Sequence, residues 1–254
     1  MLLTPENHHQ LAEEGYLHIP NVFTGDQIAQ LHSEVDDLHR SMQQEPHPDA
    51  HITWEEHLDA SAEPKIRQLL NSELVCPEIG RMLSPDSPLI GIMGQLLGPE
   101  MMLFHSKLMM KSAQDGSITP WHQDWGYWQY HHINPSQYNA MLAIDAADEA
   151  NGCIRFVPGS YKAGPIDHKD FGTRGFNKGL EGSITDRENR AIRMEPGDIV
   201  IFGALIIHGS APTTSDRHRR ANTFAFDKVG NHRSDNQSSD SRRRIQVAEG
   251  LLNA

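Results

Sequence analysis

The sequence has little cysteine, little basic charge and no long apolar run, and each shortage excludes a class of protein. Two cysteines, Cys76 and Cys153, stand among 254 residues, so a disulfide framework is excluded and both are expected to be buried, small apolar residues. With 22 Lys and Arg against 34 Asp and Glu, the formal net charge is −12, which argues against a general binder of nucleic acid or anionic membranes. No apolar stretch approaches the roughly 20 residues that span a bilayer, and the N-terminus lacks the pattern of a secretion signal. We expect a soluble, cytoplasmic protein whose oligomeric state the sequence leaves open.

The chain is expected to form one domain, 1–254, whose first hundred residues are mainly helical. A chain of this length suits a single large domain. Thr4 and Thr24 are typical N-terminal caps of two helices, and a further helix is predicted over 88–97. The stretch 43–64 mixes acids, His and Pro without periodicity, which predicts a surface loop.

After residue 100 the pattern changes to short strands separated by Asn-Gly and Pro-Gly turns. The strand-like segments are 102–111, 138–145, 153–160, 198–203 and 221–228. Many short strands after a helical beginning indicate a mainly β fold with flanking helices. We expect a jelly roll, the cupin-like double-stranded β-helix, with its core over 101–230 and the N-terminal helices packed outside. The stretch 170–190 is a candidate flap, and the polar segment 231–254 is expected to include an exposed loop or loose tail.

The segment "TPWHQDWGYW" contains a candidate pair of metal ligands, His122 and Asp124. Residues two apart point the same way in a strand and diverge on a helix. Pro120 and Gly126 disfavour a helix, so we expect an extended segment that presents both side chains to one ion. By itself a His-x-Asp pattern is a weak indication in a chain with 16 His and 34 acidic residues.

A second segment, 197–221, strengthens the metal hypothesis. Its apolar strand is followed by His208 as the first polar side chain, and Arg219 comes eleven residues later. Two His and one carboxylate are typical of non-haem Fe(II) oxygenases, and a guanidinium can clamp the far carboxylate of 2-oxoglutarate. We expect a hairpin that returns from His208 and sets Arg219 beside the metal. The alternatives are a satisfied core histidine and a solvated basic run over 217–220.

Taken together, four segments resemble the phytanoyl-CoA dioxygenase family of Fe(II)- and 2-oxoglutarate-dependent oxygenases. They are "EEGYLHIPNVFTGDQIAQLHSEV", "WHQD", "NGCIRFVPGSYKAG" and "GDIVIFGALIIHGSAPTTSDRHRRA". The resemblance implies Fe(II) as cofactor and 2-oxoglutarate and O2 as cosubstrates. It also implies hydroxylation of an unactivated C–H bond, with release of succinate and CO2.

The resemblance also implies roles for individual residues. His122, Asp124 and His208 would hold the iron, and Arg219 and Ser210 would hold the 2-oxoglutarate carboxylate. Related halogenases lack the carboxylate ligand so that chloride can bind iron. Asp124 therefore favours hydroxylation over halogenation.

Around this centre the sequence departs from other members of the family at two positions. Met141 and Lys107 are expected on the cosubstrate-binding wall, where some members have an aromatic and an apolar residue respectively, and alternation places Asn139 on the same face as Met141. Gln123, Tyr127 and His105 are candidates for the substrate side. Because alternation places His105, Met109 and Lys111 on the face of Lys107, and Phe104, Leu108 and Met110 on the other, the wall is polar. We expect a small polar substrate, with a carboxylate or phosphonate, rather than a long acyl-CoA; the alternative is that the lysines snorkel at a strand edge.

Two other functions stay open. A Zn or Mn cupin-like hydrolase or isomerase could use the same two-His, one-Asp triad, although Arg219 has no role there. A catalytically silent binding protein could retain the scaffold, although an intact triad and Arg219 speak against decay. In each case the partner is a small molecule rather than nucleic acid or a membrane.

Overall fold

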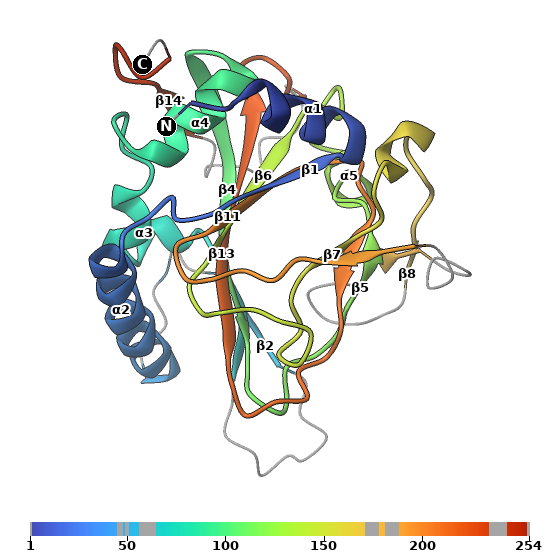
Figure 1. The fold of residues 1–254 in the computed structure, drawn as a ribbon. Helices are drawn as coiled ribbons and strands as arrows, with labels where there is room; N and C mark the ends of the chain where they lie inside the picture. Colours follow the sequence, from blue (N-terminus) through green and yellow to red (C-terminus); the bar gives the residue numbers. More distant parts are fainter. Residues whose placement is uncertain are drawn as a thin grey trace.

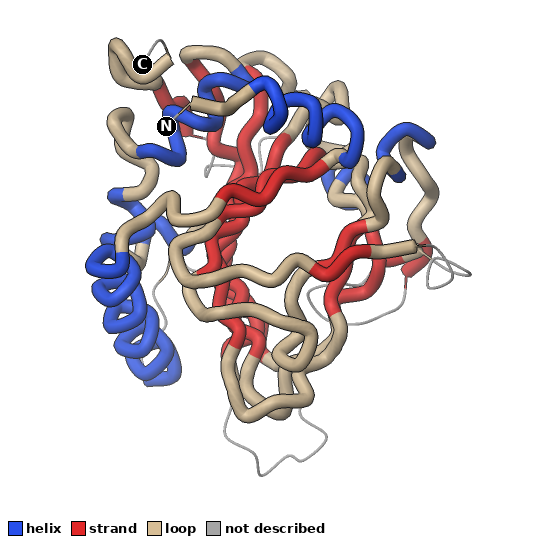
Figure 2. The backbone as a smooth tube through the Cα atoms, in the orientation of Figure 1, coloured by secondary structure: helices blue, strands red, loops and turns tan. Residues whose placement is uncertain are grey.

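The computed structural model describes residues 2–44, 48, 51–55, 65–170, 178–180, 188–233 and 243–252. Two antiparallel sheets face each other, and helices cover the outer side of the larger one (Figure 1). Figure 2 shows the long central strands of the larger sheet and, apart from them, the short strands of the smaller one. The expected mainly β jelly roll with helices outside is confirmed.

The larger sheet has the order β1-β11-β6-β13-β4-β3-β2, and β14 also pairs with β4. These strands are β1 (Tyr16–Ile19), β2 (His51–Trp54), β3 (Ile66–Leu70), β4 (Glu100–Lys111), β6 (Tyr138–Ala143), β11 (Ile199–Gly203), β13 (Arg219–Lys228) and β14 (Arg243–Gln246). The smaller sheet has the order β10-β7-β12-β5, with β5 (Thr119–His122), β7 (Arg155–Phe156), β10 (Arg190–Ala191) and β12 (His208–Ser210). A separate pair consists of β8 (Lys169–Asp170) and β9 (Lys178–Gly179).

The structure describes the following helices, of which the first two begin at capping threonines. They are α1 (Pro5–Glu14), α2 (Gly25–Gln44), α3 (Pro77–Arg81), α4 (Pro88–Leu97) and α5 (Trp125–Trp128), with short 3-10 turns η1 (Ser72–Leu74) and η2 (Ser160–Ala163). At the start of α1, the Thr4 hydroxyl accepts a hydrogen bond from the Asn7 N–H at 3.2 Å, and the Asn7 side chain accepts one from the Thr4 N–H at 3.0 Å. The expected helices at these caps and over 88–97 are confirmed. In the part of the chain that the structure describes, none of the helices combines the length and apolar character needed to cross a membrane.

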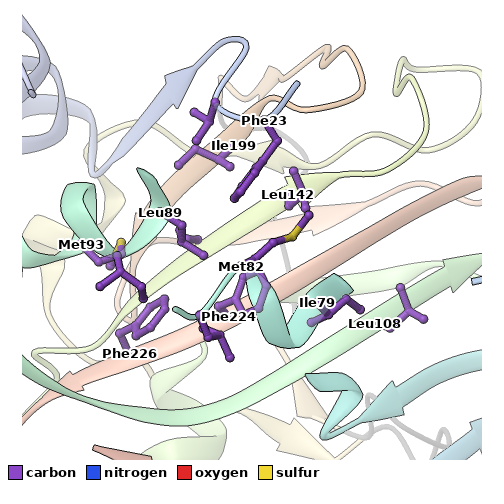
Figure 3. Close-up of a cluster of buried hydrophobic side chains, with 14 of the residues drawn as sticks. Phe23, Ile79, Met82, Leu89, Met93, Leu108, Leu142, Ile199, Phe224 and Phe226 are labelled. Atoms are coloured by element: carbon purple, nitrogen blue, oxygen red, sulfur yellow. The ribbon is translucent and has the colours of Figure 1, made fainter. Parts of the chain in front are cut away.

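An apolar core lies between the helices and the outer face of the larger sheet (Figure 3). Leu89 of α4 and Ile79 of α3 pack over alternate strand residues that include Leu108, Leu142 and Phe224. These five side chains are fully buried, and each contributes roughly 1.5–3 kcal/mol to folding by leaving water. Because strand residues alternate between faces, their neighbours along the chain point to the inner side, where the two sheets meet.

Several segments differ from the sequence-based expectations. The expected loop 43–64 includes β2, although 45–47, 49–50 and 56–64 lie outside the described residues. The C-terminal segment contributes β14 to the larger sheet, and residues 234–242 of the expected loop are not among those described. Most of the candidate flap is likewise outside them, and the predicted strand over 153–160 is limited to β7 before the η2 turn. Strands from both ends of the chain join one sheet, as a single domain requires, but the domain boundaries stay a prediction.

The alternation predicted for β4 fails at Phe104. The pairing of β13 with β4 shifts register between Ala225 and Phe226, so that β4 carries one extra residue there. This bulge turns Phe104 away from the helical layer, and its ring packs edge-on against Trp128 at 5.7 Å between centroids. The expectation that Phe104 faces the other layer is therefore wrong, whereas Leu108 and Met110 do face it.

Candidate metal centre and active site

Two histidines stand side by side on the smaller sheet. His122 ends β5 and His208 begins β12, and these residues are direct partners in the antiparallel pairing of the two strands. Their ring centroids are 4.2 Å apart. Residues paired in this way project to the same face, so the register of two strands brings together two imidazoles that are 86 positions apart in sequence.

The carboxylate that completes the group lies beyond the strand. Asp124 has helical backbone angles, φ −59° and ψ −31°, and caps the start of α5. The expectation of one extended segment is therefore wrong, because a helix forms at Gly126 although this residue disfavours one. Gly126 is instead needed inside α5, because a Cβ there would lie 2.5 Å from the His168 ring. The turn brings the Asp124 carboxylate back to within 3.7 Å of the Nε2 atoms of both His122 and His208.

Among the described residues, His122, Asp124 and His208 are the one group of His, Cys, Asp or Glu with metal-ligand spacing, because their ligand atoms all lie within 4.8 Å of one another. Backbone carbonyls select the tautomer of each ring. Nδ1 of His122 donates to the Pro120 carbonyl at 2.7 Å, and Nδ1 of His208 donates to the Ile206 carbonyl at 3.1 Å. Each Nε2 is therefore left with a lone pair toward Asp124, which is the arrangement of metal-binding histidines.

The electrostatics of the group also suit a cation. Burial lowers the pKa of His208 to about 4, so this ring is neutral at pH 7 and can act as a ligand. Burial opposes ionisation of Asp124, but the neighbouring His208 and His122 keep the pKa of this carboxyl below its ordinary value. The Asn139 amide donates to the second Asp124 oxygen at 2.7 Å. Alternation along β6 placed Asn139 beside Met141, but the sequence did not assign it this contact.

A pocket extends from the three ligands between the two sheets. Its walls come from β4, β6, β11 and β13 on one side and from β5 and β12 on the other. Met141, Lys107 and His105 line it as expected, and Met109 does so too. Lys111 does not, because its ammonium donates to the Ser117 and Ala211 carbonyls at 2.6 and 2.7 Å.

At one end of the pocket Arg219 and Ser210 present polar groups that suit a carboxylate. Arg219 is 4% exposed, its Nε donates to the Gly152 carbonyl at 3.2 Å, and no acidic side chain in the described ranges lies within ion-pair distance of it. The Ser210 hydroxyl is buried and has no hydrogen-bond partner there. Arg219 is therefore not part of a solvated basic run, although the side chain of Arg217, two residues earlier, is 47% exposed.

The path that brings Arg219 to the pocket is not the expected hairpin. His208 belongs to β12 of the smaller sheet, whereas Arg219 begins β13 of the larger sheet. The chain between them crosses from one sheet to the other, so the metal group and the guanidinium approach the pocket from opposite walls.

Two residues expected on the substrate side point elsewhere. The Gln123 amide donates to the Gly164 and Leu205 carbonyls at 3.0 and 2.7 Å, and its oxygen accepts from the Ile166 N–H at 2.8 Å. The Tyr127 hydroxyl donates to the backbone carbonyl of Lys178 at 2.5 Å. Neither residue lines the pocket, so we correct both assignments: these side chains position the backbone around the metal group.

Thr223 lines the pocket as well, although the sequence was not interpreted in this way. Thr223 lies directly opposite both Lys107 and Met141 in the central sheet. Alternation from Arg219 along β13 would have found it, because 219, 221 and 223 share a face. Trp128, one of the aromatic residues of the metal motif that could line the entrance or serve in packing, does line the pocket, and its position depends on α5, which was not predicted.

Comparisons with known proteins agree with this geometry. Residues 11–221 match the family described as phytanoyl-CoA dioxygenase (PhyH). The chain belongs to this family. Membership confirms the expected class of enzyme, a 2-oxoglutarate-dependent dioxygenase.

Similar proteins include L-proline trans-4-hydroxylase of Streptomyces griseoviridis, which is 25% identical over 86% of this chain and 84% of its own length. A probable alpha-ketoglutarate-dependent hypophosphite dioxygenase of Stutzerimonas stutzeri is 23% identical over 85% of this chain and 75% of its own length. The structure of EctD from S. alaskensis with bound Fe has a TM-score of 0.73 at 19% identity and covers 90% of this chain and 78% of that one. At this identity the last likeness shows the fold alone.

Proposed function

We propose that this chain is an Fe(II)- and 2-oxoglutarate-dependent hydroxylase of a small, polar substrate. One observation carries the proposal: three metal-type ligands and a buried guanidinium without a carboxylate partner among the described residues line one pocket. The overall reaction inserts one atom of O2 into a substrate C–H bond, and the other atom enters succinate as 2-oxoglutarate loses CO2.

His122, Asp124 and His208 would hold the iron. Two imidazoles and one carboxylate are the donor set of non-haem Fe(II) oxygenases, and bound iron with 2-oxoglutarate supplies the oxidising chemistry. Hydrogen bonds within the protein hold the three ligands in position, because backbone carbonyls orient both rings and Asn139 orients the carboxylate. Since Asp124 provides the third ligand, the site favours transfer of oxygen over transfer of a halide.

Arg219 and Ser210 would bind the distal carboxylate of 2-oxoglutarate. A buried guanidinium forms two parallel hydrogen bonds with a carboxylate, and the pair is stronger away from water. The unpartnered Ser210 hydroxyl supplies a further donor. Met141, Ile154 and Phe202 line the pocket between this end and the ligands, where they can contact the methylene groups of the cosubstrate and exclude water.

The substrate would occupy the other side of the pocket, near His105 and Lys107. The polar lining on that side, which also includes Thr223, suits a small polar molecule. The relatives support this size, because one of them is named as a hydroxylase of proline. Regiochemistry then follows from which C–H bond these side chains hold next to the metal group.

Anaerobic titration of the metal-free protein with Fe(II), and then with 2-oxoglutarate, tests the proposal. We expect the weak visible band of chelated 2-oxoglutarate in the wild type and its loss in His208→Ala. Arg219→Ala should retain iron binding and require far more 2-oxoglutarate. Arg217→Ala is the matched control, because Arg217 lies two residues away with an exposed side chain that pairs with Asp148, and its titration should follow the wild type.

Tight metal binding without the band in the wild-type protein would contradict the proposal. It would favour the hydrolase or isomerase alternative, which needs the metal group and not Arg219. Absence of metal binding would favour a silent binding protein on the same scaffold.

A further inference from the structure

Two basic residues of the pocket, Arg219 and Lys107, lie at different positions along the strands of the larger sheet. Arg219 pairs with Lys111 at one end, whereas Lys107 pairs with Thr223, four residues along β13. At about 3.3 Å per residue, the two pairs are separated by roughly 13 Å along the strands, measured between Cα atoms. Lys107 and Arg219 therefore serve opposite halves of the pocket, although both line it.

The half of the pocket around Lys107 is built from hydrogen-bond donors. Thr223, the strand partner of Lys107, offers a hydroxyl, and His105 lies two residues from Lys107 along β4, near Trp128. Burial, with a smaller effect of Lys107, lowers the pKa of His105 to about 3, so the ring is neutral and can donate one hydrogen bond. An ammonium, a hydroxyl and a neutral imidazole together are suited to the oxygens of an acid group.

The total charge of the pocket also favours an acidic substrate. Its described lining contains two basic side chains, Lys107 and Arg219, and one carboxylate, Asp124. Burial lowers the pKa of Lys107 and Asp124 opposes this effect; an acid group beside Lys107 would favour its ammonium form in the same way. With Lys107 protonated, and with two positive charges from Fe(II) and two negative ones from 2-oxoglutarate, the loaded pocket has one net positive charge. A substrate with a single negative charge would neutralise it, and burying a balanced set of charges costs far less than burying an excess.

We infer that Lys107, with Thr223 and His105, binds an acid group of the substrate, and that the substrate is a small compound with one carboxylate or one singly ionised phosphonate. This inference rests on the proposed function and specifies the substrate class of the same site. Lys107 is then a specificity-determining residue, which holds the acid group while a C–H bond elsewhere in the molecule faces the metal ligands.

Matched pairs of ligands test the inference. The probes are small monocarboxylic acids without an amino group, each with its own carboxamide, and small alkylphosphonates with the corresponding neutral dimethyl esters. Protein loaded anaerobically with Fe(II) and 2-oxoglutarate is titrated with each probe, and a shift of the visible band reports binding without turnover. Succinate formation in air is measured in parallel. We expect one or more acids to shift the band and their neutral partners to leave it unchanged; the two arms distinguish a carboxylate from a phosphonate.

Variants of Lys107 make the assignment specific. Lys107→Met should raise the half-saturating concentration of the active acid by at least about tenfold, because a charge-assisted hydrogen bond is lost. The 2-oxoglutarate concentration that gives half of the band should change by less than about twofold. Lys107→Arg should restore part of the affinity, and Lys228→Met, an exposed lysine on the same sheet, should behave as the wild type.

Three results would overturn the inference while leaving the proposed function intact, since the band would still form. One is a Lys107→Met variant that weakens 2-oxoglutarate instead of the acid, which would place Lys107 in the cosubstrate site. The second is equal binding of acids and their neutral partners, and the third is a panel in which no acid shifts the band. A wild-type protein that forms no band at all would overturn the proposed function, and the inference with it.

Discussion

Replacing Arg219 by Met should reduce cosubstrate affinity without reducing the stability of the fold. Methionine has a similar length and no charge, and Arg219 is 4% exposed. Its one hydrogen bond to the described residues goes from Nε to the Gly152 carbonyl at 3.2 Å. In the metal-free protein the guanidinium is thus a buried charge without an acidic partner among the described residues. Removing such a charge is not expected to destabilise the protein.

The structure gives the magnitude of both effects. Burial lowers the pKa of Arg219 to about 10 from 12.5. At about 1.4 kcal/mol per tenfold change in the ionisation equilibrium, the charge costs the metal-free fold about 3 kcal/mol over the pH range below 10. Loss of the hydrogen bond to Gly152 offsets part of this gain, by about 1–2 kcal/mol. We therefore expect the free energy of unfolding of Arg219→Met to be unchanged or up to about 2 kcal/mol higher.

The effect on 2-oxoglutarate has the opposite sign. Without Arg219, the distal carboxylate of the cosubstrate is buried with no cation opposite it. Breaking a buried ion pair by removing one partner costs about 3–5 kcal/mol, which corresponds to at least about a hundredfold increase in Kd. Ser210 alone cannot compensate, because a hydroxyl provides a single neutral hydrogen bond.

Two measurements on the same preparations separate these effects. Urea unfolding of the metal-free protein, followed by circular dichroism, gives the free energy of unfolding, and anaerobic titration of the Fe(II) protein gives the 2-oxoglutarate Kd. Arg217→Met, at an exposed position, should change neither quantity. A variant Arg219→Met that loses more than about 2 kcal/mol of stability and keeps its 2-oxoglutarate affinity would refute the reasoning, because Arg219 would then be a structural cation.

Three further predictions concern the metal group and its surroundings. Asn139→Ser removes the amide that orients the carboxylate ligand, so we expect roughly 10–100-fold weaker Fe(II) binding in an anaerobic competition titration; unchanged affinity would show that the amide has no such role. Gly126→Ala places a Cβ 2.5 Å from the His168 ring and should cost about 1–3 kcal/mol, measured by urea unfolding, whereas Gly25→Ala, with open space around it, should not. The folded pKa of His208, about 4, lies below that of an unfolded histidine, so the unfolded state binds more protons between pH 4 and about 6.5. The metal-free protein should therefore lose stability as pH falls through this window, and equal urea midpoints at pH 7 and pH 5 would contradict the assignment.

Regular strands explain why much of the pocket wall could be predicted from sequence. A strand has a strict period of two, so once Lys107 was placed toward the pocket, Met109 followed, and Met141 with Asn139 followed on β6. The same rule failed at Phe104 because β4 carries a bulge there. Nothing local marks this extra residue, since it is defined by the register against β13.

The metal ligands show a second limit of prediction from sequence. The residue types and spacing identified the metal group, but the conformation assigned to Asp124 was wrong. The turn after His122 depends on contacts with distant segments: the Trp125 N–H donates to the Ala204 carbonyl at 3.0 Å, and the His168 ring packs against Gly126. Spacing along the chain cannot reveal such contacts, and the misassignment of Gln123 has the same origin, because its three partners lie more than 40 positions away.

The packing between the two sheets sets the distance between the metal group and the cosubstrate site. The His208 ring contacts Phe202 of the larger sheet at 4.8 Å between centroids, and Phe156 lies against Phe202 at 5.1 Å. Because a close-packed interior resists compression and expansion, these aromatic contacts hold the wall that bears His208 at a constant separation from the wall that bears Arg219. Under the proposed function, a cosubstrate that must reach both walls would be selected by its length, so the inter-sheet core that stabilises the fold would also determine which acid can bridge the pocket.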